Sequence, residues 1–479
     1  MIFNSLPFLA FIFLFFPIYF SLTGKARLLF CLAASYFFYG YWDWRFLTLI
    51  LASTLIDFSI GKRIGALHEE KGRSKAKKQL LIVSLVVNLG FLALFKYYNF
   101  FIESFEELLL NFGIKASADS LNIILPVGIS FYTFQSMSYA IDVYRKQISV
   151  ERDFWKFATY ISFFPQLVAG PIVRAKDFLP QFERERQFNW TRFMSGMSQV
   201  IWGFFKKVAI ADSLAPFVDQ CFEMPEAFSS LHLIIGILFY SFQIYCDFSG
   251  YSDIAIGLAR MMGFDFPENF KTPYFSRSFS EFWTRWHITL SSWLRDYLYI
   301  PLGGNRYGQF NTFRNLMITM LLGGLWHGAS WVFVFWGFLH GLYLILQRVL
   351  QKPVAQFWKV LRLPNFLQAG ISISVVYLLT CFAWIFFRSP DFTTASFYIQ
   401  LIAAFEDTSP SSIINKFMVL KCGILLAFLL FVELTNFRLH YVNLLVKKPV
   451  LRTFVFALLL WMIAFFGTFG GNSFIYFQF

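Results

Sequence analysis

His327 has the residue type and the surroundings to do chemistry where water is excluded. Residues 323–328 read GGLWHG, inside an apolar run from Leu316 to Leu346 that holds two histidines but no carboxylate, lysine or arginine. Burying a titratable ring there is costly unless the ring is used or paired. The flanking glycines predict a helix break, and broken backbone at membrane depth needs protein or a water-filled cavity around it. We therefore expect His327 in a cavity and not against lipid; a packed bend with a structural histidine is the alternative.

General base catalysis is the chemistry that suits a neutral histidine in a dry cavity. Such a ring takes a proton from a hydroxyl group as that hydroxyl attacks an activated acyl group, and burial keeps the ring unprotonated by lowering its pKa. His287 is the second candidate. Arg285 and Arg295 are candidates to meet anionic groups of a donor, and the amides near Gly323 and Gly324 are candidates to stabilise an oxyanion.

The remaining histidines and the common catalytic motifs give weaker signals. His68 and His440 are expected at the surface in polar segments, His232 at the start of a span, and His340 in a structural role. A third ligand at tight spacing is not evident beside the two candidate histidines, which argues against a metal site. The sequence has no Gly-x-Ser-x-Gly, P-loop or Gly-x-Gly-x-x-Gly motif, so a serine triad and nucleotide chemistry are unsupported.

The composition indicates a membrane protein that holds these residues within its spans. The chain has 479 residues, of which 57% are hydrophobic and 14% charged, whereas soluble proteins have about 25% charged residues. Repeated apolar runs predict an all-α polytopic protein with roughly 11–13 transmembrane, broken or re-entrant helices. The net charge of +13 fits basic cytoplasmic loops and anionic lipid, with no nucleic acid involved. The five cysteines are interpreted as buried apolar residues, and without repeats residues 1–479 are taken as a single domain.

The first half of the chain is expected to contain five spans. They lie at about Leu6–Phe20, Leu28–Tyr41, Phe46–Ile60, Leu80–Phe95 and Ile123–Val143. Lys25 and Arg27 follow the first span and are placed in the cytoplasm, as is the strongly basic loop Lys62–Lys78. The amphipathic, acidic segment Tyr97–Ala118 is expected along the outer interface.

Interrupted elements are expected around the candidate residues in the second half. Two prolines predict that Phe154–Val168 is re-entrant or interfacial, and Phe193–Ile210 is expected as a span or half-span. Leu231–Ile256 is a long span interrupted by polar residues, and Phe279–Ile300 is too polar to face lipid all round. Further spans are expected at about Leu367–Phe387, Phe417–Val432 and Phe454–Phe469, which places the C-terminal tail outside the cell.

Six motifs in this order resemble the membrane-bound O-acyltransferase family, in its bacterial alginate O-acetyltransferase branch. They are FPQLVAGPI at 164–172, DFSGYSD at 247–253, PENF at 267–270, EFWTRWHITL at 281–290, WLRDYLYIPLGGNR at 293–306 and GLWHG at 324–328. The resemblance implies a ring of helices around a central funnel. It also implies that His327 is the essential histidine and His287 the second histidine of the family.

The resemblance further implies an activity and its partners. The family moves an acyl group, usually acetyl in this branch, from a cytoplasmic thioester such as acetyl-CoA to a hydroxyl, with no bound cofactor. Similar proteins of the bacterial inner membrane hand the group to an extracytoplasmic partner of the SGNH-hydrolase type, which acylates a cell-surface polysaccharide. A phospholipid acyltransferase of the same family and a transport or export subunit without a covalent step are the alternatives.

The aromatic tail at 474–479 has two interpretations. It fits an aromatic belt at the membrane interface. It also resembles the C-terminal tyrosine motif of related acyl-transfer systems, in which a tyrosine hydroxyl is proposed to receive and relay the acyl group. On that interpretation Tyr476 accepts acetyl with help from His327.

Overall fold

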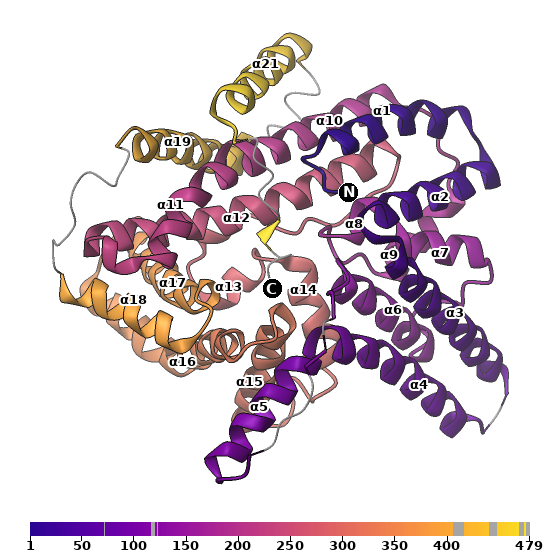
Figure 1. The fold of residues 1–479 in the computed structure, drawn as a ribbon, viewed down its shortest axis with the longest axis horizontal. Coiled ribbons are helices and arrows are strands. Elements are labelled where there is room, and N and C mark those ends of the chain that lie inside the picture. The colour runs from indigo at the N-terminus through magenta and orange to yellow at the C-terminus, as the bar shows by residue number, and fades with distance from the viewer. Residues whose placement is uncertain are drawn as a thin grey trace. The chain divides into compact units, whose positions relative to one another are not determined.

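The computed structural model describes residues 1–70, 72–115, 120–121, 123–405, 416–439, 448–468 and 474–475, which form helices and no strands (Figure 1). Within these residues seven helical segments are long and apolar enough to cross a membrane, and two shorter apolar helices accompany them. The predicted all-α polytopic class is therefore confirmed. His440 and Tyr476 fall outside the described residues, and the central funnel stays a prediction.

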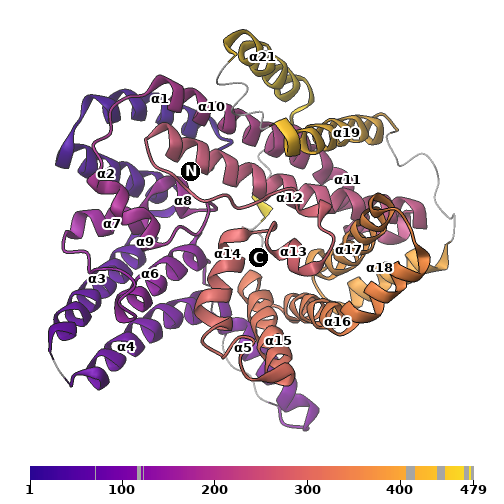
Figure 2. The same ribbon diagram turned by 180° about the vertical axis from the view of Figure 1, so that it is seen from behind.

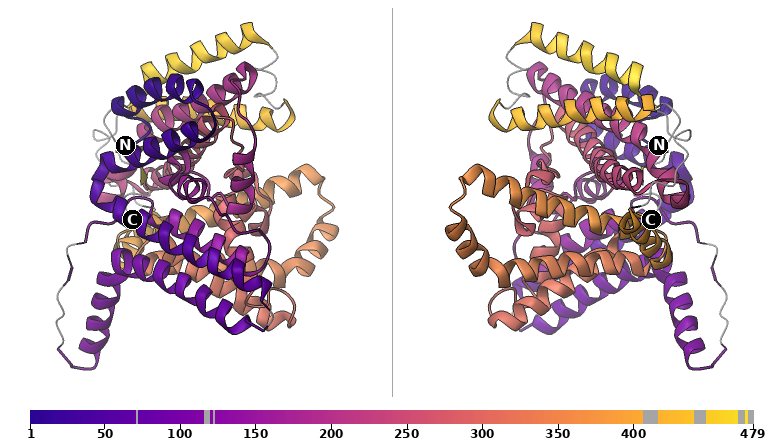
Figure 3. Two further views of the ribbon diagram at one scale, coloured as in Figure 1. Left: turned by 90° about the vertical axis from the view of Figure 1, so that its right-hand side faces the viewer. Right: turned by 90° about the vertical axis from the view of Figure 1, so that its left-hand side faces the viewer.

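The chain divides into two compact units, and the single domain proposed for residues 1–479 stays a prediction. Unit 1 comprises Met1–Met197 and Ile254–Pro267, and unit 2 comprises Ser198–Asp253 and Glu268–Phe479. The α-helices wholly within unit 1 are α1 (Leu6–Ser21), α2 (Gly24–Asp43), α3 (Leu47–Glu69), α4 (Ser74–Leu92), α5 (Tyr98–Asn111), α6 (Ile129–Tyr144), α7 (Phe154–Ser162), α8 (Phe164–Leu167) and α9 (Ala175–Phe178). Helices α3, α4, α6 and α7 lie side by side (Figure 2), and α5 projects away from them (Figure 3).

Two helices of unit 1 are shorter than the segments predicted from the sequence, one because of a glycine and the other beside a proline. The span predicted from Ile123 begins only at Ile129, because Gly128 adopts a left-handed φ of 76°. A Cβ atom at Gly128 would lie 2.4 Å from the carbonyl oxygen of Leu167, so only glycine fits there. The predicted helix 154–168 is divided by Phe163 into α7 and α8, in agreement with its proline.

Unit 2 holds both candidate histidines. Its helices include a π-helical segment η4 (Phe205–Ala211), α11 (Asp212–Glu223), α13 (Phe279–Trp283), α14 (Ile288–Leu294), a second π-helical segment η7 (Arg295–Tyr299), α15 (Gly308–His327), α16 (Trp331–Leu361), α17 (Asn365–Arg388), α18 (Phe392–Ala404), α19 (Lys416–Leu439) and α21 (Pro449–Phe466). Two longer helices, α10 (Trp190–Phe204) and α12 (Ser230–Met261), have residues in both units.

The helix break predicted near His327 is confirmed, but it falls on the C-terminal side of that residue. Gly323 and Gly324 lie inside α15, and the chain leaves the helix at Gly328. The glycine pair serves close packing instead, because a Cβ atom at Gly324 would lie 2.2 Å from the carbonyl oxygen of Phe333 and 3.1 Å from the Cα of Gly337. The backbones of α15 and α16 therefore touch at this crossing, where the two helices pack along each other.

We expect Gly324→Ala to destabilise the protein, because the added methyl group overlaps the backbone of α16. The cost of such overpacking is about 1–3 kcal/mol, measured as a lower midpoint of thermal unfolding of the purified protein by tryptophan fluorescence. Gly370→Ala on α17 is the matched control, since a Cβ atom there meets nothing within 4 Å. If both variants unfolded at the same midpoint as the wild type, the close contact between the backbones of α15 and α16 would be wrong.

Candidate active site

His327 is the last residue of α15 and its ring is enclosed by aromatic side chains. The residue is 3% exposed. Its ring centroid lies 5.1 Å from Trp326, 5.0 Å from Trp336 on α16 and 5.3 Å from Phe387 on α17. The side chain therefore faces protein and not an exposed apolar surface, while the predicted cavity around it stays a prediction.

His287 lies between α13 and α14 and is held by one amide. It is fully buried and adopts a left-handed φ of 41°. Its Nδ1 is 3.1 Å from Oδ1 of Asn269, which also accepts a hydrogen bond of 2.8 Å from the Thr289 hydroxyl. Since the backbone amide of Thr289, which can only donate, also bonds to this atom at 3.3 Å, the atom is the amide oxygen and Nδ1 of His287 is the protonated nitrogen. Burial lowers the pKa of His287 to about 3, so its ring is neutral and Nε2 carries the lone pair.

One indole joins the two candidate histidines. The ring of Trp326 lies 5.9 Å from that of His287 and 5.1 Å from that of His327, in both cases edge to face. His340, expected to be structural, is fully buried and packs at 4.7 Å against Trp336, the same ring that contacts His327. The structure thus places three histidines in one aromatic cluster.

The two candidate arginines each lie beside a carboxylate from their own segment. Arg285 forms an ion pair of 2.7 Å with Glu281, and Arg295 one of 2.7 Å with Asp296. The proposed oxyanion role of Gly323 and Gly324 is not supported, because amides inside a helix donate to the carbonyl groups four residues earlier.

A buried ion cluster on α12 is the feature that sequence reasoning missed. Nζ of Lys207 lies 2.8 Å from Asp212 and 2.6 Å from Asp247, and none of these three side chains is more than 4% exposed. The neighbouring Lys206 pairs with Asp253 at 2.6 Å and donates to Ser249 at 2.8 Å. Two aspartates within a long apolar span, together with two consecutive lysines in another apolar segment, were the available signal.

Glycine and a π-helix bring the lysines of this cluster to α12. Gly250 lies between Asp247 and Asp253 in the sequence of α12, and a Cβ atom there would be 2.7 Å from the carbonyl oxygen of Gly203. Both lysines lie in η4, whose π-helical winding is a local departure from the α-helix and is frequent at functional sites.

The tail segment 474–475 is anchored in the same cluster. The backbone amide of Ile475 donates to Oδ2 of Asp247 at 2.7 Å. Phe474 packs at 4.6 Å on Tyr251 and at 5.6 Å on Phe248, and the Phe248 ring lies 4.6 Å from that of His287. The residues that precede Tyr476 are therefore buried one side chain away from a candidate histidine.

Metal-ligating side chains do not gather within the described part of the chain. No group of three or more His, Cys, Asp or Glu residues there could hold a metal ion.

Comparison with known proteins gives one family and several similar proteins. The family model described as "MBOAT, membrane-bound O-acyltransferase family" matches residues 145–387, which include the ion cluster and both candidate histidines. A probable alginate O-acetylase of Azotobacter vinelandii is 43% identical over 87% of this chain and 80% of its own length. A peptidoglycan O-acetyltransferase of Helicobacter pylori is 36% identical over 80% of this chain and 77% of its own length. A teichoic acid D-alanyltransferase of Streptococcus thermophilus is 31% identical over 49% of this chain and 58% of its own length.

We expect Lys207→Met to destabilise the protein strongly, because it leaves two buried carboxylates without their cation. Removal of one partner from a buried ion pair costs about 3–5 kcal/mol, to be measured as the midpoint of thermal unfolding. The triple variant Lys207→Met, Asp212→Asn, Asp247→Asn should recover much of the loss. Lys75→Met, at an exposed lysine, is the control, and equal midpoints for it and Lys207→Met would contradict the paired cluster.

Proposed function

Because this chain belongs to the membrane-bound O-acyltransferase family, we propose that it moves an acetyl group from a cytoplasmic thioester across the membrane for O-acetylation of a cell-surface or secreted polysaccharide. Membership of the family makes the chain a multi-pass membrane O-acyltransferase. The observation that carries the choice of site is the buried, aromatic enclosure of His327 beside His287. Similar proteins named for O-acetylation of alginate and of peptidoglycan support a polysaccharide as the final acceptor.

In the proposed reaction His327 is the general base. Its ring takes the proton of the acceptor hydroxyl while the oxygen attacks the thioester carbonyl, a C–O bond forms, the C–S bond breaks, and the thiolate leaves with a proton returned by the ring. The surrounding Trp and Phe rings exclude the water that would hydrolyse the thioester. His287, neutral and fixed by Asn269, orients or polarises the reacting groups through Nε2.

The donor and its contacts belong to the same proposal. Acetyl-CoA or another acyl thioester is the donor substrate, and no bound cofactor is needed. Arg285 and Arg295 remain the candidates to meet its anionic groups, and each would do so alongside its present carboxylate partner.

The proposed setting is the bacterial inner membrane, with an extracytoplasmic SGNH-hydrolase-like partner that completes transfer to the polymer. Tyr476 is proposed as the relay that carries the acetyl group outward. The observation that supports this proposal is the anchoring of the two residues before it, at Asp247 and beside Phe248. The names of the similar proteins favour this function over a phospholipid acyltransferase, and membership of an acyltransferase family favours it over an export subunit without a covalent step.

We expect His327→Ala to abolish acetylation with little effect on folding, because it removes the base. General base catalysis contributes roughly 10²–10⁴-fold to a rate, so transfer of radiolabelled acetyl from acetyl-CoA to polymer in membranes should fall by that factor. His232→Ala is the control, since that ring forms its hydrogen bond with Ser229 at the start of α12. Transfer at wild-type rates by a folded His327→Ala protein would remove His327 from the mechanism.

We expect Tyr476→Phe to lose polymer acetylation, because the relay needs the hydroxyl and the change leaves the ring in place. The measurement is the ester-linked acetate content of purified polymer from cells that carry only the variant gene. Tyr307→Phe, at a tyrosine that is 68% exposed, should keep the wild-type content. Full acetylation with Tyr476→Phe would eliminate the relay and leave the His327 proposal standing.

A further inference from the structure

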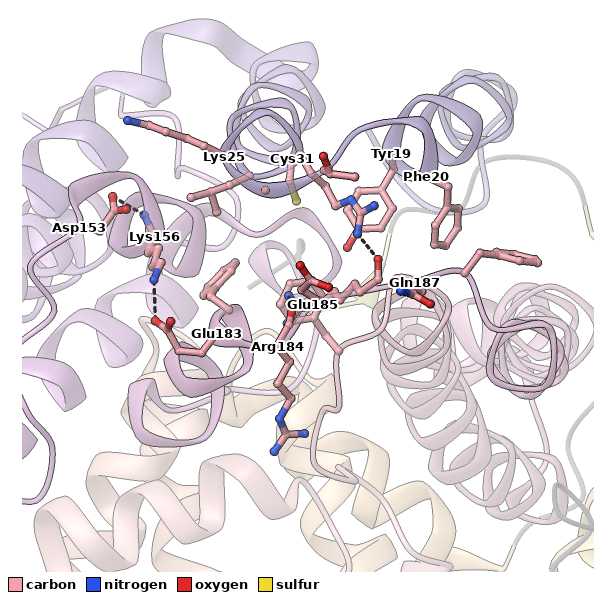
Figure 4. A pocket seen from close by; sticks show the side chains of 18 residues that line it. Tyr19, Phe20, Lys25, Cys31, Asp153, Lys156, Glu183, Arg184, Glu185 and Gln187 are labelled. Atoms are coloured by element: carbon pink, nitrogen blue, oxygen red, sulfur yellow. Dashed lines mark hydrogen bonds and ion pairs between the residues drawn. The ribbon is translucent and has the colours of Figure 1, made fainter.

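Unit 1 contains a pocket that the proposed reaction does not use. Its volume is about 660 Å³, and it lies where the end of α1 and the start of α2 meet the segment 182–188 (Figure 4). Five basic and three acidic residues line it together with aromatic side chains. Lys156 pairs with Glu183 at 2.6 Å, while Lys25 and Arg184 extend away from Tyr19 and Cys31 (Figure 4). The other charged lining residues are Arg27 and Arg186, with Asp153 and Glu185.

Backbone carbonyl groups hold both of these guanidinium groups. Nε of Arg27 donates to the carbonyl of Leu22 at 2.6 Å, and Nη1 donates to the carbonyl of Arg186. Arg186 in turn donates to the carbonyls of Gln181 and, at 3.2 Å, of Arg184. Among the described residues neither guanidinium lies within ion-pair distance of a carboxylate, and the buried Nε of Arg186 has no hydrogen-bond partner there. Both side chains are thus fixed in place with positive charge and donors to spare.

Aromatic faces complete the fixation of the two arginines. The guanidinium carbon of Arg186 lies 3.8 Å from the ring centroid of Phe264, and that of Arg27 lies 5.2 Å from that of Tyr19. Burial, with the like charge of Arg27 as a smaller contribution, lowers the pKa of Arg186. An anion between the two groups would relieve this repulsion, and fixed guanidinium groups suit the oxygens of a phosphate.

The helix that leads into the pocket presents an apolar surface. On α1, Leu6 and Phe13 are 82% and 80% exposed, and Leu14 is 63% exposed. In a membrane protein such a surface faces lipid chains. It ends at Tyr19 and Phe20, which line the pocket, and the basic residues that follow are those expected on the cytoplasmic side. An amphiphile with its chains along α1 would place its polar end at the two arginines.

We propose that this pocket binds the phosphodiester headgroup of an anionic phospholipid, with Arg27 and Arg186 as the phosphate ligands. Basic pockets beside membrane helices on the cytoplasmic side are suited to anionic headgroups, which the cytoplasmic leaflet supplies. The proposal does not depend on the acetyl-transfer mechanism, because its site and its measurement are both independent of His327.

The test is lipid binding by the full-length protein, purified in detergent and stripped of lipid. Dioleoylphosphatidylglycerol should raise the midpoint of thermal unfolding by about 3 °C or more, and dioleoylphosphatidylcholine should not. In native mass spectrometry the fraction of protein with one bound phosphatidylglycerol should fall at least fivefold in Arg27→Gln and in Arg186→Gln. Arg186→Lys keeps the positive charge but loses the planar guanidinium group, so its lipid-bound fraction should lie between those of the glutamine variants and that of the wild type. Lys75→Gln, a lysine of the other basic loop, should bind as the wild type does.

Three outcomes would overturn the proposal. Equal shifts of the unfolding midpoint with both lipids would mean that the protein does not recognise the net negative charge of the headgroup, since both lipids carry a phosphodiester. If Arg186→Lys and a folded glutamine variant (Arg27→Gln or Arg186→Gln) both bound phosphatidylglycerol as the wild type does, the lipid site would lie elsewhere. An arginine-dependent shift with acetyl-CoA in place of phosphatidylglycerol would assign the pocket to the phosphates of the donor and not to a lipid.

Discussion

The pairing of charge within apolar helices is the constraint on which the rest of the site depends. Lys207 meets two aspartates in surroundings where an unpaired carboxylate would cost several kcal/mol. Asp247 forms an ion pair with Lys207 through one oxygen and accepts a hydrogen bond from the amide of Ile475 with the other. Three stretches far apart in the sequence, namely η4, α12 and residues 474–475, are therefore obliged to meet at one carboxylate. The close contact at Gly250 permits that meeting, since a side chain there would separate α12 from the helix that carries the lysines.

The ion cluster is coupled to the histidines by the next residue of α12. Phe248 follows Asp247 and packs on both His287 and Phe474. His287 has its tautomer set by Asn269, whose own amide is held by Ser252 one turn further along α12. A single helix thus positions the tail, one histidine and the residue that orients it. A change in the pairing of Asp247 would therefore reach His287 through the Phe248 ring and through the Asn269 amide.

The sequence was sufficient for features that depend on local pattern. Apolar runs, proline and glycine gave the all-α membrane class and the break beside His327, and six motifs gave the family. The sequence did not predict which polar groups pair with each other, because pairing depends on which segments meet in the fold. Ile475 and Asp247 are 228 residues apart, and Lys206 and Ser249 are 43 residues apart. Local pattern also misplaced the role of Gly324, since a glycine that breaks a helix and a glycine that lets two helices touch look alike in sequence. Arg285 and Arg295 show the same limit, because a cation in a motif does not reveal the carboxylate that it already faces.

The two candidate histidines lie at helix ends of opposite partial charge. His327 occupies the last position of α15, where carbonyl groups without intrahelical donors give the helix end a partial negative charge. His287 immediately precedes α14, at the helix end of partial positive charge, which disfavours protonation in addition to burial. The break that ends α15 is fixed by close contact as well, because a Cβ atom at position 328 would lie 2.2 Å from the Phe333 ring. The fold thus places one histidine at the C-terminal end of a helix and the other just before the N-terminal end of a helix, with Trp326 in contact with both.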